Sequence, residues 1–308
     1  MSYDMKKIDN EKWNHYRNVI KENKKKLSKL FYTKKKLVCD LYFQNMNKDL
    51  NISNPVTFTE KITASKLDKK KMKLYSKYAD KNEVRKYVSK KIGDEYLIKQ
   101  YFAKEYITPN DLKKLPNSFA LKTTNGSGTN YIVMDKNKEN LDEICEYMNG
   151  LLDIEYGYIH GEFLYNYIKP KIVAEKLLTD SNGLIPDDLK CFCFQDDKGV
   201  KRKILYIERV IGDERKRIMF DENWEIVDYG CSFQKLNINI KKPKNYKKIL
   251  KIIDKLSEDF NFVRVDLYIL NNKIFFGELT FIPTAGYLKF DDDSIDSLWG
   301  SYIGSNLK

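Results

Sequence analysis

The sequence predicts an α+β fold with more than one β-sheet. Residues 1–91 read mostly as basic helices, whereas the remainder alternates short apolar strands with amphipathic helices. Two pairs of strands are close neighbours in the sequence and are joined by turn residues, which is typical of antiparallel hairpins. A doubly wound parallel sheet would need a helix between successive strands, so we expect several smaller sheets instead.

Length and charge limit the possible functions. The 308 residues suffice for one enzyme of two or three lobes, and a hydrophobic content of 42% argues against disorder. Residues 1–104 hold 27 Lys and Arg against 12 Asp and Glu, whereas residues 105–308 hold 29 against 32. The basic front third could meet nucleotide phosphates, an acidic polymer or a membrane surface, or could simply form solvated helix faces. The slightly acidic remainder, without a nucleic-acid-binding motif, argues against RNA or DNA as a partner.

The cysteine and histidine contents limit the chemistry further. Five Cys without a CxxC pair, and no secretory signal at the N-terminus, indicate reduced thiols and a cytoplasmic protein. No apolar run approaches the ~18 residues needed to cross a bilayer, so we expect no transmembrane segment and, at most, peripheral membrane contact. With only His15 and His160, a Ser-His-Asp triad or a multi-histidine zinc site is hard to assemble. Catalysis is therefore expected to rest on Lys, Arg and carboxylates.

The helices of the front third are divided by a proline. Residues 1–50 form a first helical stretch, which ends before Asn54-Pro55 because the residue before a proline avoids the helical region. A second helical stretch is expected at 57–91, ending near Gly93. The role of residues 1–50 stays open between a docking helix, a contact with a lipid surface and a cap packed on the following lobe, of which the cap is the simplest.

The remainder of the chain is predicted from hydrophobic periodicity. Amphipathic helices are expected at 141–152 and 249–260, and strands at 119–122, 131–134, 171–178, 190–195, 203–209, 218–220, 262–270 and 273–282.

The last hairpin carries the strongest chemical signal. Its first strand has one fully apolar face, with Arg264 and Asp266 on the other. Asp266 and Glu278 are six residues on either side of Asn272, so a turn with an odd number of residues centred there would place them opposite each other, and Arg264 opposite Thr280. Two carboxylates this close repel unless a cation lies between them or one is protonated, and such hard oxygen ligands suit Mg²⁺. A two-residue turn would shift this register, and the alternative is a surface hairpin with incidental acids.

Two features upstream of the hairpin are compatible with a bound nucleotide. Lys122 precedes the loop 123–129, whose Gly126 and Gly128 would let backbone N–H groups approach phosphate oxygens. The pattern is neither a P-loop nor GxGxxG, and Asn-Gly-Ser-Gly is also a good hairpin turn that needs no ligand. The apolar strand at 172–178 could present backbone groups to a flat base, or could be an ordinary core strand.

Six short motifs follow one another along the chain. They are NPVTFTEK at 54–61, YADK at 78–81, LK at 121–122 with GSG at 126–128, PDDLK at 186–190, FVRVDLY at 262–268 and FGELTFIP at 276–283. No single motif is decisive, but in this order they resemble an ATP-grasp enzyme of the TupA-like branch, which is associated with bacterial surface polysaccharide synthesis. The resemblance covers roughly residues 54–303.

This resemblance implies an ATP-grasp fold, in which two α+β lobes clasp ATP, with ATP and Mg²⁺ as cofactors. Residues 1–75 would form a helical basic N-terminal extension, 76–178 the N-terminal lobe with the glycine-rich loop and the hinge, and 179–308 the C-terminal lobe with the magnesium-binding strands.

The resemblance also assigns roles to single residues. Lys81 and Lys122 match two nucleotide-binding lysines, and Lys122 would reach the phosphate that is transferred. Arg264 matches the arginine that steadies the reacting phosphate. The other matched nucleotide positions are Gly126, Ser127 and Gly128 in a mobile loop over the β- and γ-phosphates, Glu175, Lys176, Leu177 and Leu178 at the adenine hinge, and Asp188 and Lys190 near the ribose and phosphates.

The metal positions include one departure from the family pattern. Asp266 and Glu278 match the magnesium carboxylates, but Thr280 stands where many ATP-grasp enzymes have Asn. A hydroxyl can still coordinate, so Thr280 is kept as a third ligand. Thr129 stands where a third glycine is common, which would stiffen the loop, and Leu189 stands where this branch usually carries an aromatic residue.

The implied reaction is ADP-forming ligation of a carboxylate and an amine. The carboxylate would belong to a uronic acid or a related sugar acid of a glycan precursor, and the amine to an amino acid or amino alcohol. Arg209, Arg215 and Arg217 are candidates for holding the acid, unless they form only a charged hairpin surface. Two alternatives stay open: a phosphotransferase acting on a sugar hydroxyl, and a non-catalytic binder of acidic polymer.

Overall fold

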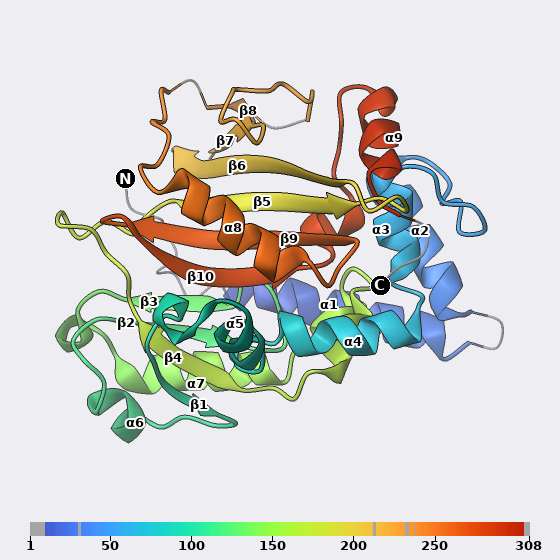
Figure 1. The fold of residues 1–308 in the computed structure, drawn as a ribbon. Helices are drawn as coiled ribbons and strands as arrows, with labels where there is room; N and C mark the ends of the chain where they lie inside the picture. Colours follow the sequence, from blue (N-terminus) through green and yellow to red (C-terminus); the bar gives the residue numbers. More distant parts are fainter. Residues whose placement is uncertain (1–9, 30–31, 212–213, 232–233, 237, 305–308) are drawn as a thin grey trace.

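Two sheets, each flanked by helices, make up the molecule (Figure 1). The computed structural model describes residues 10–29, 32–211, 214–231, 234–236 and 238–304. The expectation of an α+β fold with several sheets is confirmed. Among the residues described, no helix is long and apolar enough to span a bilayer.

The smaller sheet has four antiparallel strands in the order β1-β4-β2-β3. Helix α7 (Leu141–Leu152) buries one apolar side against it, as its periodicity predicted. The sequence did not predict β1 or the short helix α6 (Pro109–Lys113). The strands are β1 (Gln100–Lys104), β2 (Phe119–Thr123), β3 (Asn130–Val133) and β4 (Ile172–Lys176).

The larger sheet has six strands in the order β10-β9-β5-β6-β7-β8, antiparallel except for the short β8, which runs parallel to β7. Helix α8 (Tyr246–Ser257) lies across one face of this sheet (Figure 1). The strands are β5 (Asp188–Gln195), β6 (Lys201–Ile211), β7 (Glu214–Phe220), β8 (Gln234–Lys235), β9 (Phe262–Leu270) and β10 (Lys273–Thr280).

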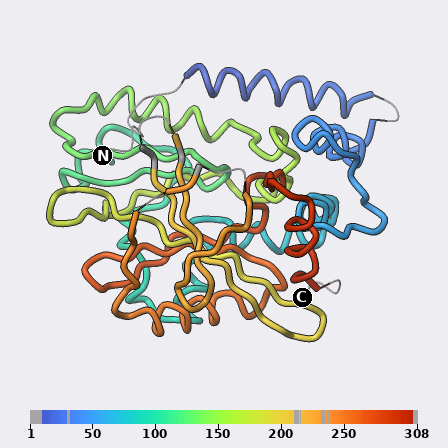
Figure 2. Tube along the Cα trace, turned by 90° about the horizontal axis from the view of Figure 1, so that it is seen from above, coloured from blue at the N-terminus to red at the C-terminus, as the bar shows by residue number. Residues whose placement is uncertain are grey.

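Helix α1 (Asn10–Leu27) packs as a cap on the lobe of the smaller sheet. Trp13 and Ile20 are buried in the same core as β2 and α7, and the Trp13 Nε1 donates a hydrogen bond of 2.7 Å to the Tyr147 hydroxyl. Figure 2 shows α1 running along the outside of this lobe. The simplest of the three interpretations for the front of the chain therefore holds for α1.

The next helices belong instead to the core of the larger sheet. The chain expected as one helix over 57–91 forms three, because Asp68 caps a new helix and Asp80 accepts hydrogen bonds from the N–H groups of Asn82 and Glu83. Tyr75 stacks on Phe281 with 4.1 Å between ring centroids. The helices are α2 (Lys34–Met46), α3 (Phe58–Ser65), α4 (Lys69–Ala79) and α5 (Val84–Ile92). The proposed division of the chain at residues 75 and 178 stays a prediction.

The C-terminal helix α9 (Asp293–Ser301), which was not predicted, packs against the start of α3. Asp296 accepts hydrogen bonds from the Thr59 N–H (2.9 Å) and hydroxyl (2.6 Å) at the start of α3. Short 3₁₀ helices complete the described elements: Asp94–Tyr96, Lys136–Lys138, Tyr156–Tyr158, Phe163–Tyr167 and Pro283–Gly286.

Candidate active site

The β9–β10 hairpin brings two carboxylates opposite each other. Glu278 pairs with Asp266, and Thr280 pairs with Arg264, as the sequence predicted. Asp266 is only 3% exposed, whereas 44% of the Glu278 side chain is exposed. Of the two carboxylates, Glu278 is therefore the one that opens to solvent.

The turn that produces this pairing differs from the expected one. Leu270 pairs with Lys273, so the turn has two residues, Asn271 and Asn272, both with positive φ (50° and 60°), as a type I′ turn requires. Such a turn alone would put the two acids out of register. A bulge at Gly277 restores the pairing by inserting one residue into β10. The odd-numbered turn was thus wrong, while the facing carboxylates are confirmed.

Gly277 has a steric reason to be glycine. A Cβ atom at this position would lie 2.9 Å from the Asp266 carbonyl oxygen, closer than such contacts allow. The bulge therefore needs a residue without a side chain directly beside the first carboxylate.

Arg264 binds all three side chains predicted to hold the metal. Its Nε and Nη2 donate to the two Asp266 carboxylate oxygens, each at 2.7 Å. The same Nη2 donates to Glu278 Oε1 at 2.9 Å and to the Thr280 hydroxyl at 3.0 Å. The guanidinium thus fixes the geometry of the two acids and the hydroxyl at once.

Lys190 is a second cation at the same carboxylate. It lies on β5 directly opposite Asp266, and its Nζ donates to Asp266 Oδ2 at 2.6 Å and to Asp188 Oδ2 at 2.8 Å. Its neighbours are thus the metal-position acid and an acid of the same strand. The assignment of Asp188 and Lys190 to ribose and phosphate stays a prediction.

The charge of Glu278 is strongly stabilised. Enclosure by protein would raise its pKa, but Arg264, together with Lys190, Lys81 and Lys122, lowers the pKa of Glu278 to about 2. The group is therefore an anion at every physiological pH, which a metal ligand must be.

The donor set of the hairpin fits a magnesium ion. Asp266, Glu278 and the Thr280 hydroxyl offer hard oxygens from adjacent positions of two paired strands. Within the described ranges no cluster of three or more His, Cys, Asp or Glu side chains forms a closed metal cage. Mg²⁺ normally takes only one or two protein carboxylates and shares the rest of its shell with water and phosphate oxygens, so two acids suffice.

Two lysines of the other lobe reach towards this hairpin. The Lys122 Nζ donates to Glu175 Oε2 at 2.9 Å. Burial alone would lower the pKa of Lys122, but the negative charge of Glu175 raises it above its ordinary value. The Lys81 Nζ donates to the carbonyl oxygens of Thr123 (3.0 Å) and Gly126 (2.8 Å), and burial lowers its pKa, with Glu278 opposing the shift. One lysine is thus held by a carboxylate, the other by backbone carbonyls.

Part of this set lines one cavity, which we call the charged pocket, whereas Asp188, Lys190, Asp266 and Lys122 do not line it. It has a volume of about 390 Å³ and lies between the β9–β10 hairpin, the glycine-rich loop and the loop that follows α7. Five predicted site residues line it: Lys81, Ser127, Arg264, Glu278 and Thr280.

Comparison with known families agrees with this geometry. The family model for TupA-like ATPgrasp matches residues 60–304. The chain belongs to the TupA-like ATP-grasp family. Its fold is therefore an ATP-grasp fold, and its cofactors are ATP and Mg²⁺. No curated protein sequence is significantly similar to the chain.

Solved ATP-grasp structures resemble this family member only distantly. The ADP complex of a carboxyaminoimidazole ribonucleotide synthetase (purK) is 12% identical over 68% of this chain and 46% of its own, with a TM-score of 0.44. D-alanine–D-alanine ligase from Bacillus anthracis is 17% identical over 67% and 58%, with a TM-score of 0.37. Phosphoribosylamine–glycine ligase from Thermotoga maritima is 14% identical over 69% and 51%, with a TM-score of 0.38. The chain thus spans about half of the length of these structures.

The residues predicted to form the adenine hinge lie at the end of β4. Leu177 forms a small apolar cluster with Ala120 and Ile132, which is suited to a flat apolar surface. Glu175 is buried and engaged by Lys122, with Arg85 at 3.7 Å, so its carboxylate is held by cations. Lys176 is exposed and Leu178 is buried. A role in binding adenine stays a prediction for residues 175–178.

The glycine-rich loop is anchored at its base and open at its tip. The Thr123 hydroxyl donates to the Thr129 hydroxyl at 2.7 Å, which agrees with the stiffening expected of a threonine here. Gly126 is buried, whereas Ser127 and Gly128 are exposed. The exposed tip is the part that can approach a phosphate.

The candidate substrate arginines do not line the charged pocket. The Arg209 Nε donates to both Asp187 carboxylate oxygens at 2.9 Å, and Arg217 forms an ion pair with Glu208. Arg215 belongs to β7, but its side chain lies outside the described residues. Contact of these arginines with a substrate stays a prediction.

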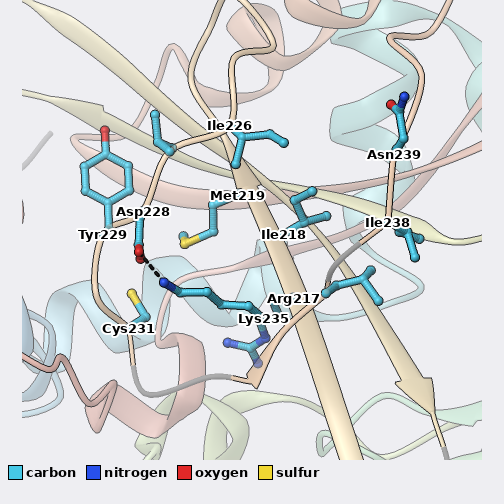
Figure 3. Close-up of a pocket in the computed structure, with 12 residues that line it drawn as sticks. Arg217, Ile218, Met219, Ile226, Asp228, Tyr229, Cys231, Lys235, Ile238 and Asn239 are labelled. Carbon is cyan, nitrogen blue, oxygen red and sulfur yellow. Dashed lines mark hydrogen bonds and ion pairs between the residues drawn. The ribbon is translucent and has the colours of Figure 1, made fainter.

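Arg217 instead lines a second and larger cavity, which we call the edge cavity. It has a volume of about 700 Å³ and lies at the β7–β8 edge of the larger sheet. Figure 3 shows apolar side chains such as Met219 and Ile218 on its walls, with an ion pair between Asp228 and Lys235.

Sequence reasoning missed the wall of the charged pocket that faces the hairpin. Its residues come from α2, from the loop after α7 and from the chain after β10, and no local pattern connects them. They include Asn45, Tyr156, His160, Glu162, Tyr165 and Tyr287.

Proposed function

We propose that this ATP-grasp protein is an ADP-forming ligase that joins a carboxylate to an amine. One observation carries the proposal: Glu278, Arg264 and Thr280 of the metal-type hairpin line the same pocket as Lys81 and the tip of the glycine-rich loop. That arrangement puts a phosphate-binding loop, cations and metal-type oxygens around one cavity, which is what in-line phosphoryl transfer requires. A cytoplasmic location, where ATP is supplied, goes with this proposal.

Each side chain has a defined task in the proposed reaction. Bound between the lobes, ATP with Mg²⁺ supplies the γ-phosphoryl group and the neutralisation of its charge. Asp266, Glu278 and Thr280 would hold the metal, and Lys122 would bind the phosphates from the other lobe. Arg264 donates hydrogen bonds to both acids and would stabilise the charge on the transferred phosphoryl group. The protein contributes positioning and charge, so its two histidines are no handicap.

The proposed reaction has two steps, phosphoryl transfer and then amide formation. An oxygen of the substrate carboxylate attacks the γ-phosphorus, the bond to the bridging oxygen breaks, and ADP leaves. The product of this step is an acyl phosphate. An amine nitrogen attacks its carbonyl carbon, the bond from carbon to the phosphate oxygen breaks, and inorganic phosphate leaves with the amide formed.

We propose a uronic acid or a related sugar acid as the carboxylate substrate. The resemblance to enzymes of surface polysaccharide synthesis supports this choice, as does the size of the charged pocket, since about 390 Å³ accommodates a monosaccharide unit beside the hairpin. An amino acid or amino alcohol is the proposed amine, and Arg209, Arg215 and Arg217 remain candidates for holding a longer glycan outside the pocket.

The test is ADP release across a panel of uronic acids crossed with amino acids and amino alcohols. The ligase proposal expects ADP and phosphate in equal amounts, and full rates only when a carboxylate and an amine are both present. ADP release with a neutral sugar as the only acceptor, without free phosphate, would show a phosphotransferase instead. If neither ATP nor ADP raises the melting temperature in the presence of Mg²⁺, both enzymatic readings fail.

A further inference from the structure

The wall of the charged pocket that faces the hairpin contains a buried acid. Glu162 is 6% exposed and lines the pocket. Within the part of the chain that the structure describes, its carboxylate makes no hydrogen bond or salt bridge. A buried acid without a hydrogen-bonded partner is costly even with the charge of Lys66 nearby, and such a group in a pocket is a candidate functional residue.

Aromatic rings surround this acid. Tyr156 and Tyr165 line the same pocket with their ring centroids 5.0 Å apart, and His160 and Tyr287 complete the wall. Burial raises the pKa of the Tyr156 and Tyr165 hydroxyls, with the charge of Glu162 adding to the effect, so the rings stay neutral. Neutral aromatic rings with one carboxylate form an environment that favours an organic ammonium ion.

Lys66 lies behind this wall and is the charged neighbour of Glu162. Its Nζ donates to the carbonyl oxygen of His160 at 2.8 Å and lies 4.2 Å from the ring centroid of Tyr287. Lys66 is 1% exposed and does not line the pocket, whereas Glu162 does, and each of the two charges opposes the pKa shift that burial causes in the other. Burial lowers the pKa of Lys66 and raises that of Glu162.

The two ends of the pocket thus have opposite character. Arg264 and Lys81 are the cations at the hairpin end, where an anionic phosphate and carboxylate would bind. Glu162 is the acid at the aromatic end. A cavity with an anion-binding end and an ammonium-binding end suits a reaction between a carboxylate and an amine.

Helix α2 holds the Glu162 loop in place. Gly161 has a φ of +69°, and a Cβ atom there would lie 3.3 Å from Val38 Cγ2 on α2. Asn45, near the end of the same helix, lines the pocket. The helices before the nucleotide-binding residues therefore build one end of the pocket and do more than cap the molecule.

We propose that Glu162 binds the amine substrate through its ammonium group and accepts the proton that must leave before the nitrogen can attack. The proposal rests on the ligase function proposed above and assigns the amine to the aromatic end of the charged pocket. The ammonium gives one proton to the Glu162 carboxylate, and its nitrogen lone pair attacks the acyl carbon. The bond to the phosphate oxygen breaks, and the second nitrogen proton leaves with the phosphate.

Two nucleophiles of different basicity test the assignment. Hydroxylamine is largely unprotonated at neutral pH and traps an acyl phosphate without a base, whereas ethanolamine must first lose a proton. The uronic acid that gives the fastest ADP release serves as the carboxylate. In Glu162→Gln, we expect ethanolamine-dependent product to fall by about 10²-fold, the low end of what a general base contributes, and hydroxamate formation to stay within about threefold of wild type.

Two further variants separate binding from folding. Glu155→Gln removes an exposed acid seven residues earlier, paired with Lys24 of α1, and should leave both rates unchanged. Glu162→Asp keeps a carboxylate and should recover part of the ethanolamine rate. An unchanged melting temperature shift with ADP shows in each variant that the nucleotide still binds.

The outcomes distinguish the two proposals. Equal loss of both nucleophile rates in Glu162→Gln, or no loss with ethanolamine, overturns the role of Glu162 while leaving the ligase intact. The role of Glu162 is also overturned if the wild-type protein forms hydroxamate from hydroxylamine but forms no product from ethanolamine or another amine that is protonated at neutral pH. A wild type that releases no ADP with any carboxylate and either nucleophile defeats the ligase proposal, and the assignment of Glu162 with it.

Discussion

The edge cavity and the charged pocket differ in a way that separates size from chemistry. The edge cavity measures about 700 Å³ and the charged pocket about 390 Å³. Large apolar cavities are the usual first choice for a binding site. Yet the edge cavity brings no metal-type hairpin or phosphate-binding loop together, and its acid, Asp228, is already paired with Lys235 (Figure 3).

The charged pocket, in contrast, is lined by acids that remain accessible to a ligand. Arg264 binds both hairpin acids, and Glu278 still opens to the cavity. Glu162 at the other end has no hydrogen-bonded partner among the described residues. The comparison indicates that the site lies where acids of the pocket wall remain available to a ligand. The following predictions test this conclusion.

The largest difference between the cavities should come from removing one acid in each. Glu278→Gln replaces a proposed metal ligand with a neutral amide, and we expect ADP release to fall by about 10³-fold, as when a preorganised group that stabilises the transition state is lost. Asp228→Asn removes the exposed acid of the edge cavity, and the rate should change by less than about twofold. Steady-state ADP release measures both.

The stabilities of the two acid variants serve as the control. Each should lie within about 1 kcal/mol of wild type in urea unfolding, because neither acid is fully buried. Comparable loss of activity in both variants would erase the distinction between the cavities.

Lys122, the lysine proposed to bind the nucleotide, should matter more for nucleotide affinity than a structural lysine of similar burial. In Lys122→Met, we expect ADP affinity to fall roughly ten- to hundredfold, which corresponds to about 1.5–3 kcal/mol for a hydrogen bond to a charged group. Lys203 of β6 is the matched control, since its side chain is 9% exposed and is paired with Glu222 and with Asp254 of α8. Isothermal titration calorimetry with ADP gives both affinities.

Both lysine variants lose a buried ion pair, so both should be destabilised. Only Lys122→Met should lose nucleotide affinity. If Lys203→Met weakens ADP binding as much, the effect reflects general loss of structure and Lys122 has no special role.

The bulge at Gly277 should affect activity, because it sets the spacing of Asp266 and Glu278. Gly277→Ala places a Cβ atom 2.9 Å from the Asp266 carbonyl oxygen, so the two strands must move apart beside the acids. We expect about tenfold slower ADP release and a stability loss of about 1–3 kcal/mol, as for other overpacked positions. ADP release and thermal unfolding measure the two effects.

Gly150 in α7 provides the opposite case. A Cβ atom there meets nothing closer than 3.7 Å, so Gly150→Ala should stabilise the helix by about 0.5–1 kcal/mol without changing the rate. A Gly277→Ala protein with wild-type activity would mean that the bulge does not set the spacing of the acids.

The same bulge shows where sequence reasoning reaches its limit. The pairing of Asp266 with Glu278 was predicted from their symmetry about Asn272, but the two-residue turn and the compensating bulge were not. The alternation of apolar and polar residues along a strand is visible in the sequence itself, so the residues that β9 and β10 present to the site could be predicted. A bulge depends on steric contact across strands, which spacing alone does not reveal.

The aromatic end of the charged pocket was hidden for a related reason. Lys66 and Glu162 are almost a hundred residues apart and meet only because α3 and the loop after α7 pack together. No local periodicity records such a contact. The packing of α2–α5 into the core of the larger sheet could not be predicted for the same reason. The sequence of each helix indicates which side is apolar, but not which surface covers that side.

The last prediction concerns how far water is excluded from the aromatic end. Burial and the nearby charge of Lys66 lower the pKa of His160 from 6.5 to about 4. Between these pH values the unfolded chain binds a proton that the folded chain does not, so His160 makes stability fall as pH decreases from 6.5 towards 4. Because the ring is partly exposed, we expect about 1–2 kcal/mol from this residue at pH 4, less than the full shift would give.

The two histidines of the chain make this test a matched pair. His160 faces Lys66, Glu162, Tyr16 and Tyr287, whereas His15 is exposed on α1. His160→Gln should remove part of the acid destabilisation in urea unfolding between pH 7 and pH 4, and His15→Gln should leave the curve unchanged. Since the other titrating groups remain in both variants, the difference between them isolates His160. Identical curves would mean that water reaches the aromatic end freely and that His160 is not buried there in solution as it is in the structure.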